Sequence, residues 1–210
     1  MSDPTIEQVQ PGTVIEENVS FEDFVRRYEG QQVEWHTGKV VQKISKDRVH
    51  QSILTMLNTV VGLYLAYKQA GRIYTDGYPM RITDDQPARQ PDILVVLNEH
   101  ADRLQHQYLD GPADFVLEII SPSTGSIDRG EKYYEYQNAG VPEYWIVDPL
   151  SKRVDGYYLE DEGHYQRISS YEGQIVSRVL PGFKLDAALL WREELPQGDE
   201  IVKPVQAMQQ

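Results

Sequence analysis

The chain has 210 residues, of which 40% are hydrophobic and 25% are charged, and it contains no cysteine. This is enough apolar material for one well-buried domain, and the missing cysteines remove the thiolate ligands of most structural zinc sites. The formal net charge of -13 disfavours a protein that wraps phosphate backbones non-specifically, because a local basic patch or bound cations would have to overcome the repulsion.

The two ends of the chain are more polar than its middle. Residues 1–19 predict an N-terminal arm, residues 20–194 a single domain and residues 195–210 a polar C-terminal tail. There is no N-terminal signal and no run of about eighteen apolar residues, since polar or small residues interrupt the apolar stretch Ile53–Tyr67. We therefore expect a cytoplasmic protein with no membrane partner.

The first half of the domain predicts a helix, a hairpin and a long helix. Ser20 resembles a helix cap, and the apolar spacing after it predicts a short helix over Phe21–Tyr28. Alternating residues on either side of a Gly-containing turn predict a hairpin over 33–44. Apolar residues then recur at three and four positions, which predicts a long helix over Asp47–Ala70 that stops at Gly71.

The middle of the chain predicts short strands and loops before a buried strand. Strands are expected at Arg72–Tyr74 and Tyr78–Ile82, followed by a polar loop through Asp84 and Asp85. The run 91–97 is an apolar strand with a carboxylate, Asp92, at its entrance. A short helix over Glu99–Tyr108 is expected to follow.

The stretch 111–149 reads as strand, loop, helix and strand. Its first strand, Phe115–Ile120, is apolar except for Glu118. Burying an unpaired carboxylate costs several kcal/mol, so Glu118 should face a polar cleft, a metal ion or a cation. The predicted helix over Asp128–Asn138 offers such a cation in Lys132, and Glu143–Val147 is the second strand.

The rest of the chain predicts a hairpin, Val154–Leu159 with His164–Ile168, and a last helix over Asp186–Glu194. The fold class expected is α/β. We expect a mixed sheet that contains the Asp92, Glu118 and Glu143 strands, with the long helix on one face and the Asp128–Asn138 helix on the other.

Asp92 and Glu118 are the strongest candidates for chemistry. They lie on apolar strands 26 positions apart, and they converge if the strands are neighbours in one sheet. Two converging carboxylates attract a divalent cation, and oxygen ligands with a few waters suit magnesium or manganese. With Lys132 nearby, the set resembles the centre of a phosphodiesterase that hydrolyses phosphate esters.

Four sequence blocks together resemble a known family. They are Pro91-Asp92, the run 115–124, the run 128–132 and Gly-Val-Pro-Glu-Tyr-Trp-Ile-Val-Asp-Pro at 140–149. In their order and spacing, over Phe21–Trp191, they resemble the Uma2 family of nucleases in the PD-(D/E)XK superfamily. The resemblance implies a restriction-endonuclease-like mixed sheet flanked by helices, with additional β-hairpins.

The resemblance also implies roles for single residues. Asp92 and Glu118 match the motif carboxylates and would ligate Mg²⁺ or Mn²⁺, with the carbonyl oxygen of Ile119 as a further ligand. The superfamily lysine two residues after the glutamate is replaced by Ile120, and Lys132 matches the position from which related proteins supply a lysine.

Two more residues match family positions near the same centre. Glu34 would be an outer metal ligand, and His50 would orient a phosphate or an acidic group. The partner implied is nucleic acid, with DNA favoured, and analogy with nucleases that cut two strands suggests a homodimer.

Each assignment has a structural alternative. Asp92 could cap its strand, Glu118 and Lys132 could form a structural salt bridge, and Lys132 could be a solvated helix residue. For Glu34 and His50, a hairpin side-chain pair and a satisfied helix histidine are the alternatives.

At the level of the whole protein, the main alternative is a catalytically inactive nuclease-like scaffold that acts as an interaction module. A two-carboxylate glycoside hydrolase fits less well, because a lysine beside the pair suits a metal-phosphate centre better.

Overall fold

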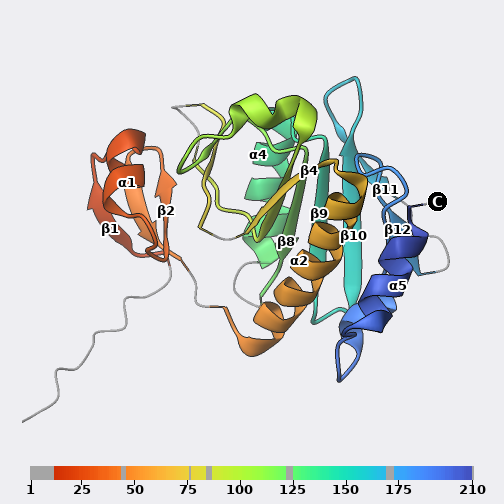
Figure 1. Cartoon of the computed structure of the whole chain (residues 1–210). Coiled ribbons are helices and arrows are strands. Elements are labelled where there is room, and N and C mark those ends of the chain that lie inside the picture. The colour runs from red at the N-terminus through yellow and green to blue at the C-terminus, as the bar shows by residue number, and fades with distance from the viewer. Residues whose placement is uncertain are drawn as a thin grey trace, which may run out of the picture.

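In a computed structural model of the chain, the described residues are 12–43, 46–75, 77–83, 87–121, 125–168 and 173–209. A six-stranded mixed sheet forms the centre of the molecule, with helices on both faces (Figure 1). The strand order is β11-β10-β9-β8-β6-β4. The strands are β4 (Gly71–Thr75), β6 (Ile93–Leu97), β8 (Phe115–Ile119), β9 (Glu143–Asp148), β10 (Arg153–Leu159) and β11 (Tyr165–Ile168).

The three central strands β6, β8 and β9 are almost completely buried, as their near-continuous apolar sequences predict. Side chains alternate between the faces of a strand, so odd-numbered residues such as Leu117 share one core with the long helix. Even-numbered residues such as Val116 share a second core with Tyr136 of the later helix. The expected α/β architecture is therefore confirmed, with one helix layer on each face.

Helix α2 (Arg48–Lys68) covers the first face and begins at Asp47, whose side chain accepts the His50 backbone N–H. By length and composition alone, α2 could also cross a membrane. This is weak evidence, because the buried core helix of a soluble protein passes the same test. The apolar side of α2 packs on the sheet, which accounts for its composition.

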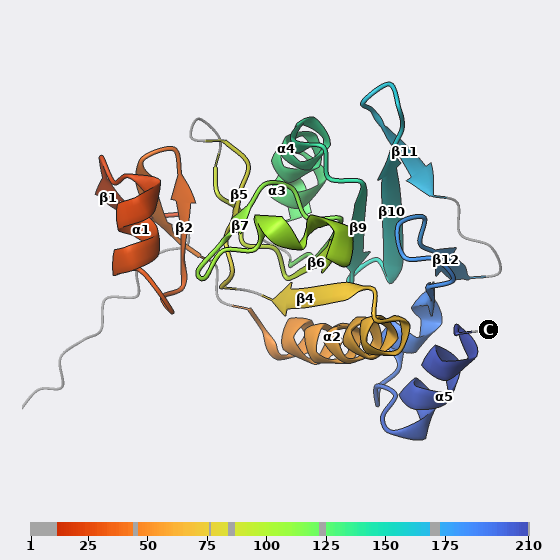
Figure 2. The ribbon, with the colours of Figure 1, turned by 45° about the horizontal axis from the view of Figure 1, so that its top comes forward.

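The second face is covered by α3 (Gly125–Arg129) and α4 (Glu131–Ala139), which connect β8 to the parallel strand β9 (Figure 2). The single helix expected over Asp128–Asn138 is therefore two helices. They meet at Gly130, whose backbone has left the helical region at φ -111° and ψ -89°. The pairs β4–β6, β6–β8, β9–β10 and β10–β11 are antiparallel.

The N-terminal elements form a small unit of their own beside the main sheet (Figure 1). Strands β1 (Val14–Glu17), β3 (Lys39–Gln42) and β2 (Val33–His36) pair in that order around helix α1 (Phe21–Arg27). A β-bridge between Trp35 and Ala88 joins the unit to the rest of the chain. Strand β1 lies inside the expected arm, of which residues 1–11 are outside the described residues.

The C-terminal region is more ordered than its polar composition predicts. The expected polar tail contains α5 (Asp199–Ala207), and its Ile201 and Val205 are buried in the core beside α2. These two residues are four positions apart and make one apolar stripe, too short to stand out in a polar sequence. Strands β12 (Gln174–Val176) and β13 (Lys184–Asp186), which the sequence did not predict, form a separate hairpin.

Three other elements are shorter than expected. The helices expected at Glu99–Tyr108 and Asp186–Glu194 are 3₁₀ turns, η1 (Asn98–Arg103) and η2 (Ala187–Trp191). Of the strand expected at Tyr78–Ile82, only β5 (Met80–Arg81) forms, parallel to β7 (Leu109–Asp110). The loop expected through Asp84 and Asp85 lies outside the described residues.

Candidate active site

The register of the central strands brings Asp92 and Glu118 together. Ile93 of β6 pairs with Leu117 of the antiparallel strand β8, so Asp92 lies beside Glu118 where that ladder ends. Both carboxylates are buried, with 3% and 4% of their surface exposed. The convergence expected from the sequence is therefore present in the fold.

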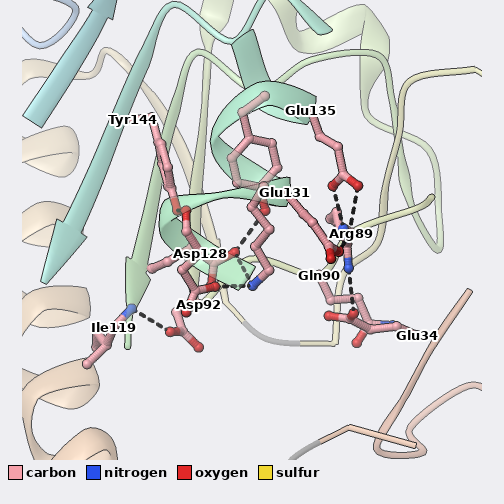
Figure 3. Close-up of polar contacts among 12 residues, drawn as sticks. Glu34, Arg89, Gln90, Asp92, Ile119, Asp128, Glu131, Glu135 and Tyr144 are labelled. Atoms are coloured by element: carbon pink, nitrogen blue, oxygen red, sulfur yellow. Dashed lines mark hydrogen bonds and ion pairs between the residues drawn. The ribbon is translucent and has the colours of Figure 1, made fainter. Parts of the chain in front are cut away.

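Three groups surround the Asp92 carboxylate. Its Oδ2 accepts the backbone N–H of Ile119 at 2.8 Å (Figure 3). The same oxygen lies 3.0 Å from Nε2 of His50, while Lys46 donates to Oδ1. Burial alone would raise the pKa of Asp92, but the hydrogen bond from His50 and the charge of Lys46 hold it well below its ordinary value. Asp92 is therefore an ionised carboxylate.

The Glu118 carboxylate faces α3 and α4. Its Oε1 accepts from Lys132 Nζ at 2.9 Å and from the Tyr136 hydroxyl at 2.8 Å. Lys132 also contacts Asp128 Oδ1 at 2.8 Å, so it lies between two buried carboxylates. Although the helix breaks at Gly130, Asp128 of α3 lies on the same side as Lys132 and Tyr136 of α4, as their four-residue spacing predicts.

The charges around Glu118 do not balance. Burial raises the pKa of Glu118 to about 7, with the nearby Asp92 and Asp128 adding to the rise and Lys132 opposing it. Burial alone would lower the pKa of Lys132, but Glu118 and Asp128 raise it well above its ordinary value. Lys132 is therefore a fixed ammonium group, and it is shared between the two carboxylates of Glu118 and Asp128.

A second cluster of polar side chains, centred on Arg89, connects the site to strand β2 of the N-terminal unit. Arg89 is buried and donates from Nε and Nη2 to the two carboxylate oxygens of Glu135, at 2.7 and 2.8 Å. Its Nη1 lies 3.4 Å from Glu34 (Figure 3). Glu34 also contacts His36 at 3.2 Å. Burial alone would raise the pKa of Glu34, but His36 and the charges of Lys132, Lys43 and Arg89 hold it well below its ordinary value.

Both groups line one cavity of about 170 Å³ between the N-terminal unit and the end of the main sheet. The residues that line it include Asp92, Glu118, Lys132, Glu34 and His50. All five residues singled out from the sequence are thus in one place. Glu34 contacts Arg89 rather than Asp92 or Glu118, and His50 contacts Asp92.

The oxygen atoms in this cavity fit a hard divalent cation. The buried Glu118 carboxylate lies beside the ionised Asp92 and, like Asp92, lines the cavity. No cluster of three or more His, Cys, Asp or Glu side chains that could enclose a metal occurs in the described ranges. Magnesium needs no such cage, since one or two carboxylates and several waters commonly hold it.

Sequence reasoning missed three basic residues and one amide residue of the cavity. Lys43 and Lys46 lie between the hairpin and α2, and Arg89 precedes the Pro91-Asp92 pair by two residues. Arg89 and Gln90 could have been noticed as polar residues directly before the motif. Nothing in the local sequence marks Lys46, because its distance from Asp92 depends on how the start of α2 meets the sheet.

The comparisons with known proteins identify a family and a fold. The family model Uma2, described as "Putative restriction endonuclease", matches residues 21–188. The "Uncharacterized protein slr1290" of Synechocystis sp. is 27% identical over 135 residues, which cover 63% of this chain and 68% of that protein.

Among solved structures, the chain resembles a "putative nuclease belonging to DUF820" from Anabaena variabilis, with a TM-score of 0.68 and 17% identity. The match covers 82% of this chain and 97% of that one, and at this identity it shows the fold. Restriction-endonuclease-like families generally use divalent metal ions. Because the family model spans most of the chain, the protein belongs to the Uma2 family of restriction-endonuclease-like proteins.

Proposed function

We propose that this protein is a divalent-metal-dependent nuclease that hydrolyses phosphodiester bonds, with DNA as the first substrate to test. One observation carries the proposal: Asp92 and Glu118 lie side by side in a cavity, with the ammonium group of Lys132 2.9 Å from Glu118. Carboxylates and an ammonium group in a water-poor site are suited to a phosphate centre. The family membership supports the same reaction class.

Asp92 and Glu118 would hold the metal, and Mg²⁺ or Mn²⁺ matches their oxygen atoms. The bound ion supplies Lewis-acid stabilisation of phosphate charge and lowers the pKa of water. His50 and the Ile119 N–H orient Asp92 through its Oδ2. Tyr136 orients Glu118 through Oε1.

Lys132 acts as a cation and not as a base in this proposal. Its raised pKa keeps it protonated at neutral pH, so it cannot take a proton from water as a general base. It can donate hydrogen bonds to a phosphate oxygen or to the attacking water and so offset developing negative charge. Asp128, at 2.8 Å, holds the ammonium group in place.

The test is nicking of supercoiled plasmid DNA by purified protein with Mg²⁺ or Mn²⁺. We expect Asp92→Ala and Glu118→Ala to abolish nicking and Lys132→Met to reduce it by roughly a hundredfold or more, a typical cost of one electrostatic group. Arg26→Ala is the matched control, because Arg26 is an exposed helix residue with an ion pair to Asp23. Equal nicking by wild type and Asp92→Ala would identify a contaminating nuclease and refute the proposal.

Metal binding is a second, independent measurement. Calorimetric titration with Mn²⁺ should give binding to the wild type and none to the Asp92→Ala variant. A wild-type protein that neither binds Mn²⁺ nor nicks DNA would instead be an inactive scaffold that acts as an interaction module.

A further inference from the structure

A cluster of three arginines lies on the sheet next to the proposed active site. Its centre is Asp155 of β10, a carboxylate with only 1% of its surface exposed. Asp155 Oδ2 accepts from Arg129 and Arg153, each at 2.8 Å, and Oδ1 accepts from Arg167 at 2.7 Å. Arg129 also donates to Asp148 at 2.9 Å. A single buried carboxylate thus holds three guanidinium groups together.

The cluster keeps positive charge and unused donors. Three arginines face two aspartates, so one positive charge is left over. The side chains of Arg153 and Arg167 are 56% and 61% exposed, so their guanidinium groups reach solvent. Among the described residues Arg167 uses only Nη2, which leaves Nε and Nη1 able to donate. A guanidinium fork of this kind matches the oxygen atoms of a phosphate.

The strand register places the cluster near the cavity. Strand β9 runs parallel to β8, with Ile146 opposite Glu118, and Asp148 ends β9 two residues later. Both strands end at the same edge of the sheet (Figure 1). Asp155 lies on β10, two strands from β8, and neighbouring strands are about 4.8 Å apart, so roughly 10 Å separates the two strands. On α3, Arg129 directly follows Asp128, which lines the cavity.

We propose that Arg129, Arg153 and Arg167 form a preorganised contact surface for the phosphodiester backbone of the nucleic acid that enters the cavity. The inference rests on the proposed nuclease function for the identity of the partner. A chain with a net charge of -13 repels a polyanion, so binding needs a local surface where cations outnumber carboxylates. Asp155 is a positioning residue in this arrangement, because it holds the arginines before the substrate arrives and reduces the entropy lost on binding.

The test measures binding without cleavage. A fluorescently labelled DNA duplex is titrated with protein in EDTA at several salt concentrations, and the logarithm of the binding constant is plotted against that of salt concentration. The variant is Arg153→Ala/Arg167→Ala, which leaves Asp155 paired with Arg129. Removing two phosphate contacts should lower the slope of this plot by about 1.8 and weaken binding at every salt concentration.

The control variant removes the same charge elsewhere. Arg26→Ala/Arg192→Ala deletes two exposed arginines that also have carboxylate partners, at 2.6 and 2.9 Å. We expect it to bind like the wild type. Melting temperatures of both variants show whether they are folded, and a variant with wild-type melting but weaker binding has lost contacts rather than structure.

The outcomes separate this proposal from the nuclease assignment. The contact surface is refuted if the salt-dependence slope is the same in wild type and Arg153→Ala/Arg167→Ala. It is also refuted if the control variant lowers the slope by the same amount. Either result holds even if the protein nicks DNA. Arginine-dependent binding by a protein that does not nick DNA supports the surface and refutes the nuclease. A parallel titration with an RNA duplex shows which nucleic acid supplies the phosphates.

Discussion

Replacing Glu118 by glutamine should make the metal-free protein more stable at pH 8 and leave its stability unchanged at acid pH. The pKa of the buried Glu118 is raised to about 7 from an ordinary value of 4.5. A raised carboxyl pKa means that this group's contribution to stability is complete below pH 4.5 and is lost as the pH rises through 7. At about 1.4 kcal/mol per pH unit, this loss is on the order of 3 kcal/mol.

The assay is urea or thermal unfolding of wild type and Glu118→Gln in EDTA between about pH 4.5 and pH 8. Glutamine cannot ionise, so the difference in unfolding free energy should grow with pH and reach roughly 10 °C in melting temperature for a chain of this size. Glu131→Gln is the control, since its side chain is 70% exposed on α4, the helix that carries Lys132. Parallel pH profiles for wild type and Glu118→Gln would refute the argument that Glu118 is short of compensating positive charge.

Four further substitutions test the packing and the buried carboxylates. Gly71→Ala would place a Cβ 2.9 Å from the Leu97 Cα and should lower the unfolding free energy by about 3 kcal/mol. Gly62→Ala in α2 would make only an ordinary van der Waals contact and should raise the unfolding free energy by up to about 1 kcal/mol. Urea midpoints that shift in the same direction for both variants would contradict this. Glu143→Ala removes an acceptor that holds four donors and should cost about 3 kcal/mol in thermal unfolding, so an unchanged melting temperature would contradict its role. Burial would raise the pKa of Asp155, but its arginine partners lower it below its ordinary value. Asp155→Asn should therefore lower the unfolding free energy by about 2 kcal/mol at neutral pH and by little in acid, below the lowered pKa. A loss of stability that does not depend on pH would contradict the pairing.

The sequence pattern was sufficient for the sheet and for the central pair of carboxylates. Strands β6, β8 and β9 are apolar on both faces, which leaves few places for them except the centre of a sheet. Once neighbouring strands hold Asp92 and Glu118 near their ends, the antiparallel register determines that the two carboxylates are close. The four-residue spacing from Asp128 to Lys132 placed the ammonium group correctly even across two helices.

The rest of the site depends on contacts between distant segments. Lys46 reaches Asp92 across 46 positions, and Arg89 reaches Glu34 across 55, distances over which a sequence pattern carries no signal. Helix α5 was missed for a different reason, since its short apolar stripe gains stability only by packing on α2. The break at Gly130 lies within a continuous helical spacing and is visible only in the backbone angles.

The packing of α5 on α2 has a practical consequence for anyone who prepares this protein. A recombinant version trimmed to the matched family region, residues 21–188, would lose Ile201 and Val205 from the core and strand β1 from the N-terminal sheet. The apolar surface uncovered on α2 would favour aggregation during purification, and loss of activity in such a preparation would say nothing about catalysis. Expression should therefore retain both ends, and affinity tags should be attached through a flexible linker beyond α5.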